Sequence, residues 1–150
     1  MKSLILFPTD TSQWYNLILE AESKTQIHLH VDTESYLVFL LMRSSRSTIW
    51  LDSLVGQELL QALQHKGQKQ KQMLVEIGDK SLLFSGMFPG HAEKKKIDPM
   101  YFVTIGQIAY ASVGSFPDEP KYKLFHDLSE NFQSLSKLLL TVRDIFINQP

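Results

Sequence analysis

The sequence contains no cysteine, and this absence removes several kinds of chemistry at once. Disulfide bonds, thiolate metal sites and cysteine nucleophiles are all excluded. The lack of cysteine is compatible with a reducing compartment, although it does not require one.

Long apolar runs are also absent. The apolar stretch near the start of the chain, residues 4–7, ends at Pro8. A secretory signal has an apolar segment of roughly 7–15 residues, and a membrane-spanning helix needs about 20. We therefore expect no membrane association and a cytoplasmic location.

The chain has no excess of charge of either sign. Its 15 Lys and Arg residues nearly balance its 16 Asp and Glu residues, which leaves a net charge of −1. The most basic run outside the connection described below contains Lys66, Lys69 and Lys71. Because binding to nucleic acid usually depends on a strongly basic surface, the charge balance argues against nucleic acid as a partner.

Motifs for catalysis and cofactor binding are missing as well. The sequence has no Gly-x-x-x-x-Gly-Lys phosphate loop, no Gly-x-Gly-x-x-Gly fingerprint and no Gly-x-Ser-x-Gly elbow. None of its five histidines follows a glutamate by three residues, as in a di-iron helix bundle. His28 and His30 lack a third ligand at a zinc-site spacing. We predict no catalytic residue, no metal and no cofactor.

Helical periodicity is the main pattern that the sequence does contain. With 150 residues, 43% of them hydrophobic, the chain is long enough to bury a core without a metal or disulfide. The pattern predicts one all-α domain over residues 1–150, a bundle of about five or six helices joined by short connections. Two short apolar stretches, residues 3–7 and 26–31, are compatible with one N-terminal β-hairpin.

Capping residues and glycines divide the pattern into helices. Helices are expected from about residue 11 onward and over about 32–42, 48–67 and 68–84. Another begins at Asp98, because its carboxylate can accept a hydrogen bond from a free amide and Pro99 needs no amide partner. We expect this helix to end near Gly114.

The C-terminal segment has the most regular apolar pattern. It predicts one long helix over 122–147, with apolar residues at alternating spacings of three and four. These residues are Phe125, Leu128, Phe132, Leu135, Leu139, Val142 and Phe146. This seam either packs against shorter helices of its own chain or pairs with a second copy in a homodimer.

A lysine-rich connection precedes the helix that starts at Asp98. It contains His91, Lys94, Lys95 and Lys96. Free amides at a helix N-terminus favour anions, so these residues are candidates for contact with an anion or an acidic partner. The simpler interpretation is that the lysines are solvated.

Four aromatic residues flank the same connection and are candidates for a ligand pocket. They are Phe84, Phe88, Tyr101 and Phe102. Pockets between helices are commonly lined by such side chains, although most aromatic residues in a small helical protein belong to its core.

Taken together, these patterns favour a non-catalytic, soluble helical protein that acts by binding another protein, with a homodimer as one form. The expected contact surfaces are the connection at Lys94–Lys96 and the outer face of the 122–147 helix. The alternative is a small-molecule binder that uses the aromatic pocket, and an enzyme of another type ranks third.

Overall fold

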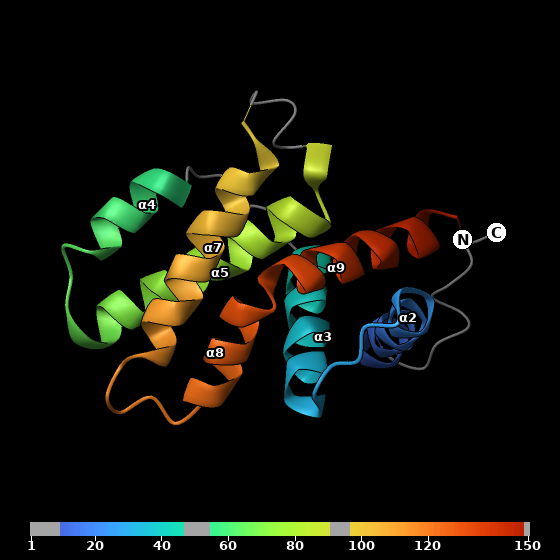
Figure 1. Cartoon of the computed structure of the whole chain (residues 1–150), viewed down its shortest axis with the longest axis horizontal. Helices are drawn as coiled ribbons and strands as arrows, with labels where there is room; N and C mark the ends of the chain where they lie inside the picture. The colour runs from blue at the N-terminus through green and yellow to red at the C-terminus, as the bar shows by residue number, and fades with distance from the viewer. Residues whose placement is uncertain (1–9, 47–54, 91–96, 149–150) are drawn as a thin grey trace.

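The computed structural model describes residues 10–46, 55–90 and 97–148, and within these ranges the chain is helical without any strand. The all-α prediction is therefore confirmed for the described part (Figure 1). The helices of eight or more residues are α2 (Asp10–Thr25), α3 (Val31–Arg46), α4 (Val55–Ala62), α5 (Gly67–Gly86), α7 (Pro99–Gly114), α8 (Tyr122–Glu130) and α9 (Phe132–Ile147).

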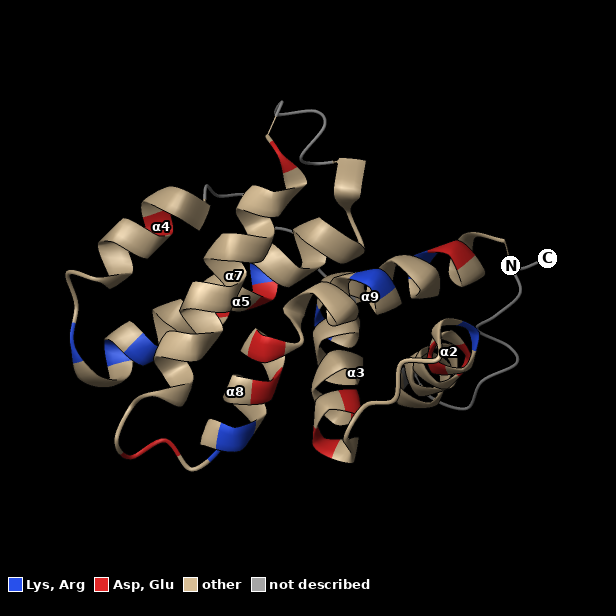
Figure 2. Ribbon diagram, in the orientation of Figure 1, with Lys and Arg blue, Asp and Glu red and all other residues tan. Residues whose placement is uncertain are grey.

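Helices α5 and α7 pack against each other at the centre of the molecule (Figure 1). Helix α5 also contacts α4 and α9, and its residues 77–84 are all buried. Helix α7 carries no charged residue, as its uniform colour in Figure 2 shows. Helix α7 packs against α4, α5, α8 and α9, and an uncharged sequence suits the faces that these helices cover. Its residues Tyr101 and Ile108 remain exposed.

Two glycines let the central helices approach closely. A Cβ atom at Gly78 of α5 would lie 2.5 Å from the ring atom Cε1 of Tyr110 on α7. A Cβ atom at Gly106 of α7 would collide with the ring of Phe132 on α9. The aromatic rings therefore occupy the space that side chains at these two positions would need.

Helix α7 begins as the sequence predicts. The carboxylate oxygen Oδ1 of Asp98 accepts a hydrogen bond from the backbone amide of Met100 at 3.0 Å, and Pro99 is the first helical residue. Helices α2, α3 and α5 also lie where helices are expected. The helix predicted over 48–67 is seen as α4 only from Val55, because residues 47–54 lie outside the described ranges.

The prediction of one continuous helix over 122–147 is wrong, because the chain changes direction between α8 and α9 (Figure 1). Asn131 separates them with φ −103° and ψ 18°, and its side-chain amide donates a 2.7 Å hydrogen bond to Oδ1 of Asp127. Helix α8 packs mainly against α7, whereas α9 packs against α2 and α5. The apolar spacing continues across Asn131, which is why the sequence pattern hides the change of partner.

The expected N-terminal hairpin is not seen. Residues 3–7 lie outside the described ranges, and residues 26–31 form the connection between α2 and α3 together with the first residue of α3. Gln26 ends α2 with a positive φ of 59°. Ile27 and Leu29 are half-buried against the core, so their alternation reflects a connection that packs two side chains inward, not a strand.

Candidate functional site

Two charged residues lie inside the apolar centre of the molecule. Asp79 and Lys80 belong to the fully buried part of α5, and each exposes less than a tenth of its surface. Charged side chains are rarely buried unless they are paired or hydrogen-bonded, since the loss of water costs several kcal/mol or more. Asp79 and Lys80 therefore need hydrogen-bond or ion-pair partners on the helices that surround α5.

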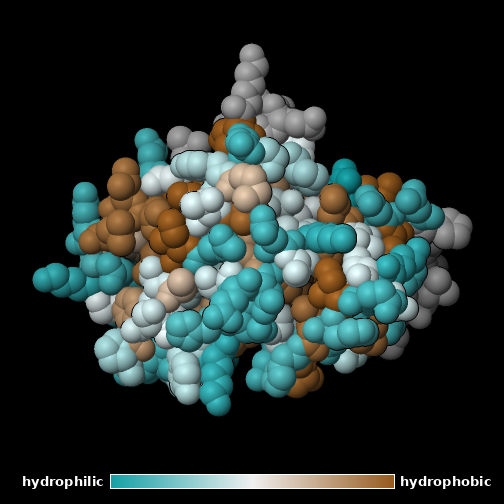
Figure 3. All heavy atoms as spheres, in the orientation of Figure 1, coloured by the Kyte–Doolittle hydropathy of each residue, from teal (hydrophilic) through white to brown (hydrophobic). Residues whose placement is uncertain are grey.

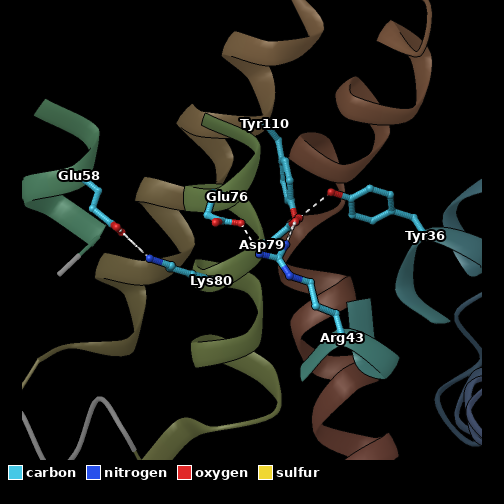
Figure 4. Close-up of polar contacts among 7 residues, drawn as sticks. All are labelled: Tyr36, Arg43, Glu58, Glu76, Asp79, Lys80 and Tyr110. Atoms are coloured by element: carbon cyan, nitrogen blue, oxygen red, sulfur yellow. Dashed lines mark hydrogen bonds and ion pairs between the residues drawn. The ribbon is translucent and has the colours of Figure 1, made fainter. Parts of the chain in front are cut away.

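Asp79 is held by two tyrosines from different helices. The hydroxyl of Tyr36 on α3 donates a 2.6 Å hydrogen bond to Oδ1 of Asp79, and the hydroxyl of Tyr110 on α7 donates one of 2.7 Å to the same oxygen. Figure 4 shows both hydroxyls directed at this carboxylate. On the other side, Nη1 of Arg43 lies 4.0 Å from Oδ2. One carboxylate thus links three helices.

Burial dominates the titration of this cluster. It raises the pKa of Asp79 from its ordinary value of 3.8 to about 6, although the two tyrosine hydroxyls and the charge of Arg43 act in the opposite direction. Burial, with the nearby charge of Asp79, also raises the pKa of both Tyr36 and Tyr110 well above the ordinary value. Both tyrosines therefore keep their protons and act as hydrogen-bond donors.

Lys80 points away from this cluster and joins α5 to α4. Its Nζ lies 2.9 Å and 2.8 Å from the two carboxylate oxygens of Glu58 (Figure 4). At the outer edge, Nη2 of Arg43 donates a 2.6 Å hydrogen bond to Oε1 of Glu76. Each charge of the network has an oppositely charged neighbour, which is the arrangement that buried charges need.

This polar network links α5 to α3, α4 and α7 through buried side chains, which is a structural role. A catalytic carboxylate must reach a substrate, whereas Asp79 is 4% exposed and its Oδ1 is already occupied by two hydroxyls. Sequence reasoning missed the network, because Asp and Lys within a helix are normally assigned to its exposed face. The one local signal is that apolar residues occur on both sides of the pair, from Ile77 to Phe84.

A separate feature of the surface is an apolar cleft between α4 and α7, with a volume of about 640 Å³. Val55, Leu59 and Leu60 contribute to its α4 side. Tyr101 and Ile105 contribute to the α7 side, and the complete lining also includes Gly56, Gln57, Ile97, Asp98 and Phe102. The cleft is thus built mainly from aliphatic and aromatic side chains, the lining expected for apolar ligands or peptide segments.

Exposed apolar side chains extend this surface beyond the cleft. Leu60 on the wall is 66% exposed, and Leu63 just after the end of α4 is 58% exposed. Tyr101, on the α7 side of the cleft, is 42% exposed. Figure 3 shows apolar atoms gathered over α4. Apolar side chains gathered along one helix differ from scattered apolar residues, which are normal on a protein surface.

The four aromatic residues predicted to form a pocket divide between the cleft and the core. Tyr101 and Phe102 line the cleft. Phe84 is buried behind them, with its ring centroid 5.2 Å from that of Phe102. Phe88 is half-buried against the core. Sequence reasoning missed the α4 wall, because proximity between α4 and α7 is a property of the tertiary structure.

The C-terminal seam lies inside the chain. Six of its seven residues, from Phe125 to Val142, are buried. Phe146 is partly buried and stacks on Trp14 of α2 with a centroid distance of 5.6 Å. The proposed anion contacts His91 and Lys94–Lys96 lie outside the described residues.

One member of the basic run considered for nucleic acid has an internal partner. Nζ of Lys71 lies 3.0 Å from Oε1 of Glu119, and both side chains are largely buried. The same ammonium group lies 5.7 Å from the centre of the Phe116 ring. Lys71 therefore anchors the connection between α7 and α8, while Lys66 and Lys69 are exposed.

No protein-family model, no curated protein sequence and no solved structure matches this chain. Within the described ranges, no three His, Asp or Glu side chains lie close enough together to hold a metal ion. In the same part of the chain, none of the helices has the length and apolar composition required to cross a bilayer.

Proposed function

We propose that this protein is a non-catalytic binding protein whose cleft between α4 and α7 receives an apolar helical segment of another protein. The observation that carries the proposal is the apolar lining of the cleft together with the exposed side chains of Leu60 and Leu63 along α4. Small-molecule sites enclose most of their ligand, whereas a helix in a groove needs an elongated apolar surface. A second copy of the chain is one form that this partner can take.

Two neighbouring helices also provide the shape that this mode of binding uses. An amphipathic helix inserts apolar side chains at spacings of three and four between two such walls. Leu59 and Leu60 on one wall and Tyr101 and Ile105 on the other provide contacts for them. In a homodimer of this protein, the cleft and not the buried C-terminal seam is the contacting surface. The cytoplasmic location expected from the sequence stays a prediction.

A small apolar ligand is the second candidate, and a specific observation favours it. Tyr101 and Phe102 are 5.8 Å apart at their ring centroids, and Phe84 continues this aromatic group into the core. Such a group provides a flat, rigid surface for a ligand in the deepest part of the cleft.

The test compares Leu60→Glu with Ile147→Glu. Both residues are exposed aliphatic side chains on helices, 66% and 57% exposed, but only Leu60 lines the cleft. Native mass spectrometry of material purified from cells that express each tagged variant reports bound polypeptides, self-association and small-molecule adducts. Circular dichroism and melting temperature check that both variants fold.

We expect the wild type and Ile147→Glu to retain a polypeptide or a second copy, and Leu60→Glu to lose it while remaining folded. Equal retention by all three proteins, or bare monomer in all three, contradicts the proposal. A small-molecule adduct that only Leu60→Glu loses would replace it with the ligand alternative.

A further inference from the structure

Two glutamates are buried where α2 packs against α3. Glu22 lies in the C-terminal part of α2 and Glu34 in the first turn of α3, and each residue is 8% exposed. The connection that begins at Gln26 reverses the chain between them. Neither residue belongs to the cleft or to the Asp79 network, so no feature described above uses them.

The hydrogen bonds at this pair leave one oxygen without a donor. Oε1 of Glu22 accepts a 3.2 Å hydrogen bond from the backbone amide of Leu29. Among the described residues, Oε2 of Glu22 is buried and receives no hydrogen bond from a protein donor. The carboxyl of Glu34 interacts with the carboxyl of Glu22. Two ionised carboxylates have only acceptors, so such a contact is favourable when one of them carries a proton.

The titration of Glu34 agrees with this geometry. Its pKa is raised from 4.5 to about 7, first by the hydrogen bond with Glu22, then by burial and by the charge of Glu22. The hydroxyl of Tyr15 acts in the opposite direction. Because the two carboxyls interact strongly, the proton belongs to the pair and not to one residue.

We propose that Glu22 and Glu34 share one proton at and below neutral pH, and that this proton fastens α2 to α3, so that its loss in alkaline solution loosens α2. Two buried carboxylates without that proton repel each other across the contact between the helices. The carboxyl pair Glu22–Glu34 is therefore a pH-sensitive contact between α2 and α3.

Other charged groups on the surrounding elements have partners or are exposed. On α9, Arg143 lies 3.8 Å from Asp144, and on α8, Asp127 accepts hydrogen bonds from Thr33 and Asn131. In the connection and at the start of α3, His30 and Asp32 are exposed, and Nδ1 of His30 lies 3.7 Å from Oδ2 of Asp32. Glu20 and Lys24 of α2, His28 of the connection and Lys137 of α9 are also exposed.

The sign of the pH effect follows from the direction of the shift. A carboxyl whose pKa is raised on folding contributes stability that is complete below its unfolded value and is lost as pH rises through the folded value. For Glu34 this range runs from about pH 4.5 to about pH 7. Helix α2 packs mainly against α9 and next against α3. Weaker contact with α3 should therefore be seen as easier opening of α2.

Hydrogen exchange of backbone amides tests the proposal. After correction for intrinsic exchange rates, we expect the protection of α2 to fall roughly tenfold between pH 6 and pH 8.5. Helix α4, which makes its main contacts with α5 and α7, serves as the internal control and should keep its protection. Glu34→Gln replaces the shared proton by a permanent N–H donor, so its α2 protection should not change with pH.

Glu20→Gln, at an exposed position of α2, is the matched control and should retain the tenfold fall. Glu22→Gln places the permanent donor on the other member of the pair and provides the same test if Glu34→Gln does not fold. The proposal is overturned if wild-type α2 shows no fall, or if a folded glutamine variant of the pair shows the same fall as the wild type.

Discussion

At the scale of single residues, Asp79 shows how a charged side chain is accommodated between packed helices. Tyr36 and Tyr110 place two hydroxyl donors on one of its oxygens, and burial still raises its pKa to about 6. Two donors thus compensate only part of the cost of removing the carboxylate from water. The folded state therefore binds a proton at Asp79 more tightly than the unfolded chain does.

This difference predicts a pH-dependent effect of Asp79→Asn. The favourable contribution of protonated Asp79 is complete below about pH 4 and is lost as pH rises to about 6. Asparagine keeps an acceptor for the tyrosines and cannot ionise. We expect the free energy of unfolding of Asp79→Asn, relative to the wild type, to increase by on the order of 3 kcal/mol between pH 4 and pH 8.

Urea denaturation at several pH values measures this change, and the subtraction of the wild type cancels other titrating groups. Asp118→Asn, at an exposed position, is the control and should follow the wild-type pH profile. If the free energy of unfolding of Asp79→Asn changes with pH in parallel with that of the wild type, folding does not raise the pKa of Asp79.

At the scale of helices, the contact between α5 and α7 depends on the absence of a side chain at Gly78. Three atoms of the Tyr110 ring lie 2.5 to 2.9 Å from the position that a Cβ atom would take. A methyl group there requires either that the helices separate or that the ring moves. Movement of the ring would also disturb the hydrogen bond from Tyr110 to Asp79.

Gly78→Ala should therefore destabilise the protein by about 1 to 3 kcal/mol, because the steric conflict outweighs the helix propensity of alanine, which favours it by about 1 kcal/mol. Chemical denaturation gives the value directly. Gly90→Ala, where no heavy atom of the described residues beyond its chain neighbours lies within 4 Å of the added Cβ, is the control and should change stability by less than about 0.5 kcal/mol. A Gly78→Ala protein as stable as the wild type would show that the helices have room to adjust.

At the scale of the whole molecule, the C-terminal residues join helices that are distant in sequence. Leu135 has no exposed surface, and the cluster of buried apolar residues to which it belongs draws members from every helix of the described part. Helix α9 contacts both α2 and α5, so it connects the N-terminal helices to the central pair. The seam thus holds the fold together from within one chain.

Leu135→Glu should consequently unfold the protein, because it removes a core side chain and buries a charge, at a combined cost of at least about 4 kcal/mol. Far-ultraviolet circular dichroism and thermal melting measure the loss. Leu140→Glu, on the same helix at a position with 38% exposure, should remain folded. A folded Leu135→Glu protein with an unchanged melting temperature would show that the C-terminal seam does not contribute to the core.

Local signals in the sequence were sufficient to predict the all-helical class, the start of α7 at Asp98 and the apolar spacing of residues 125–146. They succeed because capping and helical periodicity arise within one helix. The change of direction at Asn131 escaped prediction, since α8 and α9 keep the same spacing while they pack against different helices.

Only the tertiary structure decided which distant residues meet. Asp79 meets Tyr36, which is 43 positions away, and Tyr110, which is 31 positions away. The cleft forms because α4 lies beside α7, and the carboxyl pair forms because Glu22 of α2 lies near Glu34 of α3. These contacts depend on which helix faces pack together, and a charged residue such as Asp79 or Glu22 does not show in its own sequence whether its face is covered. The physical reason is that burial belongs to the assembled molecule and not to the segment.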